Sequence, residues 1–178
     1  MKRLINALGF QTGWWACIVG VGHGLEWPAI GLCAVLVWLH LHHSPHRRQE
    51  LMIAAAALAL GLVIDSLLQY FSVIHFYGWA LWELSPFWLW MLWVLFAMTL
   101  NASLNFLQSL PLWVSAILGG LAGPLTYLAG ASFGAAALRH TYIHFSVLAL
   151  ALAWAMALPL LIGLARQGAA ASHPTAQA

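Results

Sequence analysis

The sequence predicts an all-α integral membrane protein with six transmembrane helices. Its 178 residues are 63% hydrophobic and only 6% charged, whereas roughly a quarter of the residues in a soluble domain are charged. The mean hydropathy is +0.89, and apolar runs of about 20 residues, the length that crosses a bilayer, follow one another along the chain. A soluble fold of this size could not bury so much apolar surface, so its solvent must be lipid.

Short polar or proline-containing breaks separate the expected spans, which cover about residues 5–22, 27–43, 51–74, 86–108, 112–136 and 142–165. The second span is short and begins beside Pro28, which favours a tilted or partly interfacial helix. The fifth contains GGLAGP (119–124), where a kink or a break can occur. Residues 1–166 therefore form one transmembrane domain, and we expect the tail, 167–178, to be disordered because it has little to bury.

Basic residues set the expected orientation. With six spans, five of them fall on one side and Arg139 on the other; the five are Lys2, Arg3, Arg47, Arg48 and Arg166. Because cytoplasmic loops carry the excess of Lys and Arg, both termini should be cytoplasmic. Two three-span halves would then have inverted topology, as in many transporters, although the halves share no evident sequence similarity.

Small residues mark the expected helix contacts, because helices in lipid pack closely only where side chains are small. Gly9 and Gly13 form a GxxxG pair in the first span, and Gly119 and Gly123 form one in the fifth. The two cysteines, Cys17 and Cys33, lie in apolar runs and are best interpreted as small packing residues.

A carboxylate, Asp65, interrupts one of the most apolar stretches, GLVIDSLLQYF (61–71). Counted from Leu51, it lies roughly 21 Å into its span at about 1.5 Å per residue. An ionised aspartate near a helix centre costs about 2.5–3.5 kcal/mol, and keeping it protonated at neutral pH costs about 4 kcal/mol. In either form the side chain should face other helices, so we interpret Asp65 as a candidate site.

Other polar side chains could share the interior with Asp65. Asn101, Asn105 and Gln108 are spaced i, i+4, i+7 and should form one face of the fourth helix. The full candidate ligand-binding set is Asp65, Gln69, Asn101, Asn105, Gln108, Asn6, Gln11 and Tyr127. The alternative is purely structural, because buried amides and hydroxyls often join helices by hydrogen bonds worth about 0.6–2 kcal/mol each.

No pattern predicts a metal, a cofactor or a nucleic-acid partner. His40, His42, His43 and His46 cluster in HLHHSPHRR, but the histidine pair with helical ligand spacing, His140 and His144, falls on the opposite side. A solvated loop is therefore the better interpretation, and histidines and glutamates of the opposite face would bind a metal only if their loops converged. The net charge of +2 is too small for nucleic acid, and nucleotide loops, nucleophile elbows and HExxH are absent from the sequence.

Four blocks together resemble one family: NALGFQTGWWACIVG (6–20), GLVIDSLLQYF (61–71), PFWLWMLWVLFAMTLNASLNFLQ (86–108) and GGLAGPLTYLAGASFGA (119–135). They are similar to small, multi-pass proteins of the bacterial inner membrane known only as a domain of unknown function. The resemblance covers nearly the whole chain. The residues matching the family's pattern are Asn6, Gln11, Gly13, Trp14, Asp65, Pro86, Trp88, Trp93, Phe96, Asn101, Ser103, Leu104, Gly123, Pro124, Tyr127 and Gly130.

The resemblance implies a role with membrane lipids, because genes of this family accompany genes for fatty-acyl modification. Three hypotheses follow. The chain could bind or move a small ligand, a proton or a lipid precursor at Asp65, or it could be an accessory component that contacts lipid-modifying enzymes without its own catalysis. Thirdly, Asp65 could act as general acid or base on an acyl chain. The sequence does not indicate an oligomeric state.

Overall fold

The computed structural model describes residues 2–138 and 142–172. Six α-helices account for most of them: α1 (Lys2–Gly22), α2 (Glu26–His43), α3 (Arg47–Tyr70), α4 (Phe87–Leu100), α5 (Leu112–Ser132) and α6 (Ile143–Ser172). A 3₁₀ helix, η1 (Asn105–Ser109), follows α4. Four helices, α1, α3, α5 and α6, are long and apolar enough to cross a membrane. The chain is thus helical throughout its core, with the length and composition of a membrane protein.

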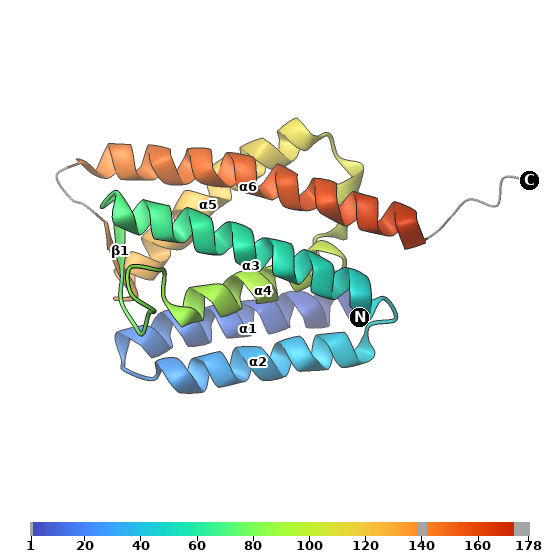
Figure 1. Cartoon of the computed structure of the whole chain (residues 1–178), viewed down its shortest axis with the longest axis horizontal. Helices are drawn as coiled ribbons and strands as arrows, with labels where there is room; N and C mark the ends of the chain where they lie inside the picture. The colour runs from blue at the N-terminus through green and yellow to red at the C-terminus, as the bar shows by residue number, and fades with distance from the viewer. Residues whose placement is uncertain (1, 139–141, 173–178) are drawn as a thin grey trace, which may run out of the picture.

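The helices run back and forth between two ends of the molecule (Figure 1). One end, called here the amino end, holds the start of α1, the turn between α2 and α3, η1 and the end of α6. The other, the ribbon end, holds two short antiparallel strands, β1 (Ile74–Phe76) and β2 (Ala136–Leu138), with His75 opposite Ala137. Consecutive helices pack as the pairs α1–α2, α3–α4 and α5–α6.

Five of the six expected spans correspond to helices whose limits differ by a few residues. The expected fourth span, 86–108, is wrong, because α4 ends at Leu100 and a turn and η1 follow. Asn101, Ser103 and Asn105 lie in this stretch, and such side chains compete for the backbone hydrogen bonds that would continue a helix. The expected break in the fifth span does not occur, since α5 continues through Pro124.

The tail also differs in part from expectation. α6 continues to Ser172, so residues 167–172 belong to a helix, and 173–178 lie outside the described residues, as do Arg139 and His140.

Glycines allow the close helix contacts that the sequence predicted. A Cβ on Gly13 of α1 would lie 2.4 Å from Leu95 Cδ2 of α4, and one on Gly119 of α5 would lie 2.4 Å from the backbone oxygen of Trp154 in α6. Real Cβ atoms do not approach so closely, so a side chain at Gly119 would displace the backbone of α6, and one at Gly13 would displace the Leu95 side chain. The two contacts confirm that the GxxxG pairs mark packing surfaces.

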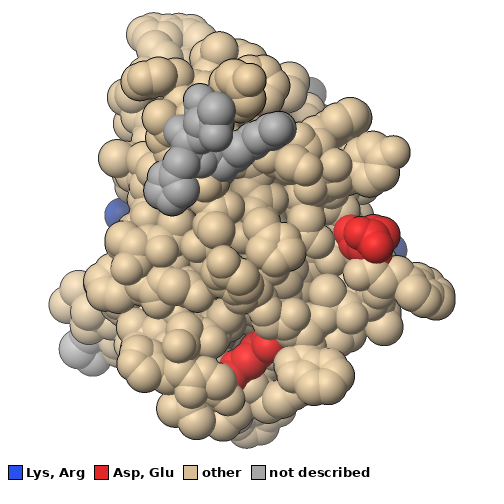
Figure 2. Space-filling model, turned by 90° about the vertical axis from the view of Figure 1, so that its left-hand side faces the viewer, with Lys and Arg blue, Asp and Glu red and all other residues tan. Residues whose placement is uncertain are grey.

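Charge is distributed unevenly between the ends. Figure 2 faces the ribbon end and shows acidic side chains there, with basic ones only at the margins of the view. Glu26, the first residue of α2, and Glu83, in the loop before α4, lie at this end. The basic residues Lys2, Arg3, Arg47, Arg48 and Arg166 belong to the amino end. The positive side of the molecule is therefore the amino end.

Candidate functional site

Asp65 of α3 is completely buried and accepts two short hydrogen bonds. Trp93 of α4 donates from Nε1 to Oδ2 over 2.7 Å, and Tyr127 of α5 donates from its hydroxyl to Oδ1 over 2.6 Å. One carboxyl group thus joins three helices. Among the described residues, no ion pair joins Asp65 to a Lys or an Arg.

A glycine one turn before Asp65 explains how Trp93 reaches it. Gly61 and Asp65 lie four residues apart and so face the same side of α3. A Cβ on Gly61 would lie 2.2 Å from the Trp93 indole. The ring therefore rests directly on the backbone of α3, and from there its N–H meets the carboxylate.

The same arrangement is repeated on α5. Gly123 lies four residues before Tyr127, and a Cβ on Gly123 would lie 2.3 Å from the indole of Trp154 in α6. The rings of Trp93 and Trp154 stack with centroids 4.8 Å apart and planes 11° apart. Two indoles are thus held between two glycines, with Asp65 and Tyr127 beside them.

A cavity of about 350 Å³ adjoins this cluster, a size within the range of small-molecule sites. Its walls come from four helices, including Phe10 and Trp14 of α1, Phe96 of α4, Ala122 of α5 and Trp154 of α6. The cavity is bounded mainly by aromatic and aliphatic side chains. It is therefore suited to an apolar ligand rather than to a hydrated ion.

The cavity opens toward the side of the bundle. Two of its lining residues, Phe106 of η1 and Leu118 of α5, are 52% and 40% exposed. α5 packs mainly on α6 and β2 rather than on α1 and α4. In a membrane, this lateral opening would face lipid tails.

Trp93 and Tyr127 line the cavity, whereas Asp65 lies behind them. The expected interior pocket with Asp65 among several amides is therefore replaced by an apolar cavity that reaches the acid through a phenol and an indole. Thr126 adds a hydroxyl to the wall, but it donates to Gly123 O of its own helix over 2.7 Å.

Donor chemistry limits what the cluster can do with a proton. An indole N–H can only donate, so Asp65 Oδ2 must accept from Trp93. A phenol carries one proton, and Tyr127 donates it to Asp65 Oδ1, so toward the cavity its oxygen can only accept. The Tyr127 hydroxyl is consequently the polar group that stands between Asp65 and the cavity.

Gln69, one turn beyond Asp65, serves the ribbon end. Its Oε1 accepts from the backbone N–H of Phe76 over 3.2 Å, and its Nε2 donates to Leu84 O over 3.4 Å. These bonds fix β1 and the loop before α4. The structure therefore places Gln69 at the ribbon end, among the loops that close the bundle, rather than beside the cavity.

The three amides expected on one helical face do not share one, because α4 ends at Leu100. Gln108 of η1 donates to Leu100 O over 2.9 Å and to Asn101 Oδ1 over 3.0 Å. It thus supplies a hydrogen-bond donor to the last backbone carbonyl of α4. Asn105 is half-buried in η1. Asn101 follows Trp93 by eight residues, about 12 Å along a helix, so this set lies away from Asp65.

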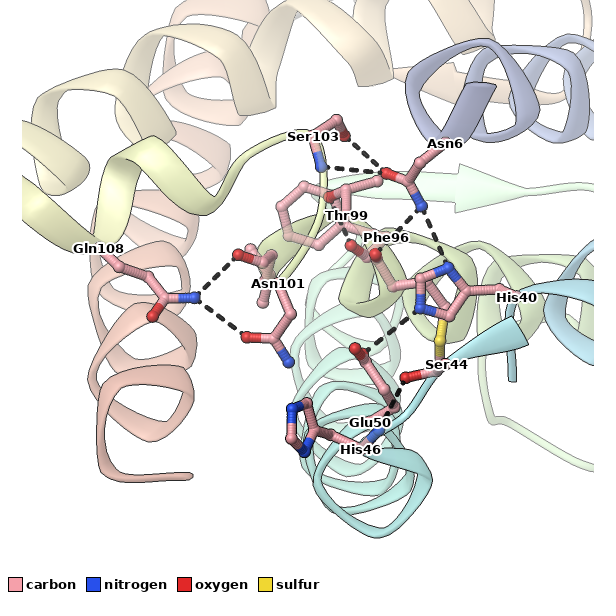
Figure 3. Close-up of polar contacts among 12 residues, drawn as sticks. Asn6, His40, Ser44, His46, Glu50, Phe96, Thr99, Asn101, Ser103 and Gln108 are labelled. Atoms are coloured by element: carbon pink, nitrogen blue, oxygen red, sulfur yellow. Dashed lines mark hydrogen bonds and ion pairs between the residues drawn. The ribbon is translucent and has the colours of Figure 1, made fainter. Parts of the chain in front are cut away.

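The two polar residues expected from the first span diverge. Gln11 is exposed on α1 and does not face the interior. Asn6 is half-buried, and its Oδ1 accepts from Ser103 N over 3.3 Å and from Ser103 Oγ over 2.7 Å (Figure 3). Its Nδ2 donates to Met98 O over 3.2 Å and faces His40 Nδ1 at 3.3 Å.

These contacts fix the tautomer of His40. A backbone N–H only donates, so the bond from Ser103 identifies the Asn6 oxygen and leaves the amide NH₂ toward His40. His40 Nδ1 must then accept, which places the ring proton on Nε2. Nε2 lies 3.6 Å from Oε2 of Glu50, which is buried (Figure 3). Hydrogen bonds thus link α1, α2 and the turn after α4, and Glu50 of α3 lies beside His40 without a hydrogen bond to it.

Sequence reasoning passed over two groups that matter here. Trp93 and Trp154 were not candidates for the site, although Gly61 and Gly123, each four residues before a polar site residue, mark where large rings can approach. The solvated loop expected around His40 is wrong for this residue, because His40 packs beside the buried Glu50 in the amino end. The ten-residue separation, with a turn between two helices, is the signal that could have paired them.

No group of three or more histidine, cysteine or acidic residues that could hold a metal occurs within the described ranges, 2–138 and 142–172. Cys17 and Cys33 are free, buried and 3.5 Å apart between their sulfur atoms, where they pack α1 on α2.

Comparison with known proteins identifies the family of this chain but does not indicate an activity. Neither the curated proteins nor the solved structures contain a match to this chain. One family model matches residues 3–160, which include the Asp65 cluster, the cavity and the Asn6 chain of contacts. The chain therefore belongs to the family described as "Protein of unknown function (DUF2878)".

Proposed function

We propose that this protein binds a lipid or lipid precursor from the surrounding bilayer, with an apolar chain in the cavity and a polar group at Tyr127. The observation that carries the proposal is the contact of an apolar, laterally open cavity with a buried acid through Tyr127. A water-soluble ligand would gain little from these walls. A molecule that is already dissolved in the membrane would bury its chain against them.

The proposal includes a topology of six crossings in a bacterial inner membrane, with the amino end in the cytoplasm. The excess of Lys and Arg at the amino end supports this orientation. α2 and α4 are the short members; α4 has 14 residues, about 21 Å at 1.5 Å per residue. The turn and η1 after α4 would complete that crossing while covered by protein, as irregular backbone within a membrane requires.

Asp65 is proposed to act through Tyr127. The carboxylate accepts the only proton of the phenol, so the phenol oxygen presents an acceptor to a donating polar group of the ligand. If the ligand exchanges a proton, Tyr127 relays it to Asp65, which is shielded from lipid and water alike. Membrane acids in such settings commonly serve proton or ligand chemistry.

Photocrosslinking tests the cavity. The full chain in vesicles is exposed to a fatty acid that carries a photoactivatable group on its chain, and crosslinked peptides are identified. We expect labels on lining residues such as Phe10, Phe96 and Ala122. Ala122→Trp should fill the cavity and abolish these labels, whereas Leu125→Trp, on the exposed face of the same helix, should leave them unchanged. Equal labelling of both variants would refute a cavity site.

A deletion strain tests the role of Asp65. We expect its lipid profile to differ from that of the parent and to be restored by the native gene but not by Asp65→Asn. An unchanged profile after deletion would exclude a function in lipid chemistry, and full rescue by Asp65→Asn would exclude a proton on Asp65.

An accessory role with lipid-modifying enzymes uses the same opening, since a chain held at the side of the bundle can be presented to a neighbour. It predicts co-purification of such an enzyme and a lipid profile that Ala122→Trp alters. A purified chain that restores the reaction without any partner would exclude it.

A further inference from the structure

We infer that the amino end carries a second lipid site, a groove between α3 and α6 that binds the phosphate headgroup of an anionic phospholipid. The groove has a volume of about 1090 Å³. It shares no lining residue with the cavity beside Asp65, so it can be tested independently of the proposed function.

The rim of the groove is basic. His46, Arg47 and Arg48 line it, and the last two begin α3. Arg47 donates from Nη2 to His42 O over 2.9 Å, which holds its guanidinium at the turn between α2 and α3. The partial positive charge at the start of α3 adds to these side chains, because first-turn backbone N–H groups point outward along the helix axis.

Among the described residues, no carboxylate side chain lines the groove. Glu50 is next to these arginines in sequence, but it is buried on the other side of α3, where its Oε2 faces His40. Asp65 is enclosed within the bundle, and Glu26 and Glu83 lie at the ribbon end. All four acidic residues of the chain are thus directed away from the groove.

Below the basic rim the groove becomes apolar. Met52, Ile53 and Ala56 of α3 and Leu164 of α6 form this part. Ala56 lies nine residues beyond Arg47, about 13 Å toward the middle of the bundle. A phosphate at the rim therefore leaves an acyl chain beside α3, whereas a free phosphate would use only the rim.

A glycine of α6, Gly168, allows α3 and α6 to approach each other closely beside the groove. A Cβ on Gly168 of α6 would lie 2.9 Å from Gln49 Cγ, and Gln49 Nε2 donates to Ala165 O over 3.5 Å. Gln49 thus ties the start of α3 to the end of α6, and the groove is bounded on both sides by fixed helices.

Native mass spectrometry of the full chain in detergent tests the headgroup preference. Phosphatidylglycerol and phosphatidylcholine are titrated separately, and we expect tighter binding of phosphatidylglycerol. Each arginine near an anionic headgroup contributes about fivefold to affinity, so the double variant Arg47→Gln/Arg48→Gln should bind about 25-fold more weakly. Lys2→Gln/Arg3→Gln is the matched control, because it removes the same charge from the same end outside the groove.

A second pair of measurements distinguishes a lipid from free phosphate. Ala56→Trp should block the apolar part and weaken phosphatidylglycerol binding, and inorganic phosphate at the same concentration should not displace the lipid. Equal affinity for the two lipids, equal losses in the two double variants, displacement by phosphate, or unchanged lipid binding by Ala56→Trp would each overturn the inference. Circular dichroism of each variant establishes that it is folded.

Discussion

The indole rings of Trp93 and Trp154 stack face to face, 4.8 Å apart, and each ring lies on a glycine of a neighbouring helix. Trp93 covers Gly61 of α3, and Trp154 covers Gly123 of α5. The four residues form a continuous stack across α3, α4, α6 and α5. Because Asp65 and Tyr127 lie one turn beyond the two glycines, the stack also sets the distance between them.

Substituting either glycine should disrupt the stack. Gly61→Ala would place a Cβ 2.2 Å from the Trp93 ring, and Gly123→Ala would place one 2.3 Å from the Trp154 ring. Neither ring can retreat without losing its partner, so we expect each variant to be destabilised by about 1–3 kcal/mol, as for an overpacked core. Thermal or denaturant unfolding in detergent measures the loss.

Gly163→Ala is the control for both. Gly163 lies within α6, and a Cβ there would meet nothing within 4 Å. Alanine favours a helix interior by up to about 1 kcal/mol over glycine, so this variant should be unchanged or more stable. If all three substitutions behaved alike, the close approach of the rings would not be what requires glycine at 61 and 123.

Removing one donor from Asp65 should be costly, and the cost should depend on the presence of the acid. Trp93→Phe or Tyr127→Phe leaves the buried acid with one donor fewer, and an unsatisfied buried group costs about 1–3 kcal/mol. Asp65→Leu combined with Tyr127→Phe removes donor and acceptor together, so it should cost less than the sum of the single losses. Additive losses in unfolding experiments would mean that the two side chains are not coupled.

The membrane class and most helices could be predicted because long apolar runs leave few alternatives. The location of Asp65 in the interior followed from the cost of exposing a carboxylate to lipid. Its partners could not be predicted, because no local pattern ties a particular indole to the acid, and only the approach of Trp93 to Gly61 in three dimensions assigns this ring to Asp65.

The end of α4 shows a second reason why a structural feature could not be predicted from the sequence. Leu104, Phe106 and Leu107 alternate with polar residues past Leu100, so a window of span length still reaches residue 108. Asn6 ends the helix from a distance of nearly a hundred residues in sequence, by binding Ser103 and Met98 O in place of helical partners. Tertiary hydrogen bonds of this kind have no local signal.

The chain of contacts through Asn6 should be sensitive to the orientation of its amide. Asn6→Asp removes the NH₂ that faces His40 Nδ1 and places two acceptors opposite each other. We therefore expect Asn6→Asp to be less stable than Asn6→Ala, although aspartate is closer in shape to asparagine. Unfolding measurements compare the two.

Two further variants show whether His40 is the reason. His40→Ala should abolish the difference between aspartate and alanine at position 6, because no ring nitrogen then faces the side chain. His43→Ala is the control, since His43 contacts Leu39 O of its own helix. A difference that persisted without His40 would contradict the assigned tautomer.

Glu26 provides a prediction for pH, because it is a carboxyl group at the ribbon end, just outside the expected second span, 27–43. It is only 5% exposed, its Oε2 accepts from Trp79 N over 2.8 Å, and its Oε1 is buried without a hydrogen-bond partner among the described residues. Burial raises the pKa of Glu26 above its ordinary value of 4.5, although the bond from Trp79 opposes part of this effect.

The raised pKa determines the sign of the pH effect. Below pH 4.5 Glu26 is protonated in the folded and unfolded states, so burial carries no charge penalty. As pH rises, the unfolded state ionises first, and the folded state loses relative stability until its own pKa has been passed. Glu26→Gln retains an acceptor for Trp79 but cannot ionise. Its melting temperature should therefore match the native value near about pH 4, where Glu26 is protonated in both states. It should exceed the native value near about pH 7, above the ordinary carboxyl pKa of the unfolded state.

Glu83→Gln is the matched control for that measurement, because it removes an equal charge from an exposed position in the same loop region. A surface substitution of this kind should change the unfolding free energy by less than about 0.5 kcal/mol. Melting curves of the three proteins in one detergent, between about pH 4 and pH 8, span the range in which ordinary and raised carboxyl groups titrate. If Glu26→Gln and Glu83→Gln showed the same pH profile, net charge at the ribbon end would explain the effect, and burial of Glu26 beneath the Trp79 loop would not.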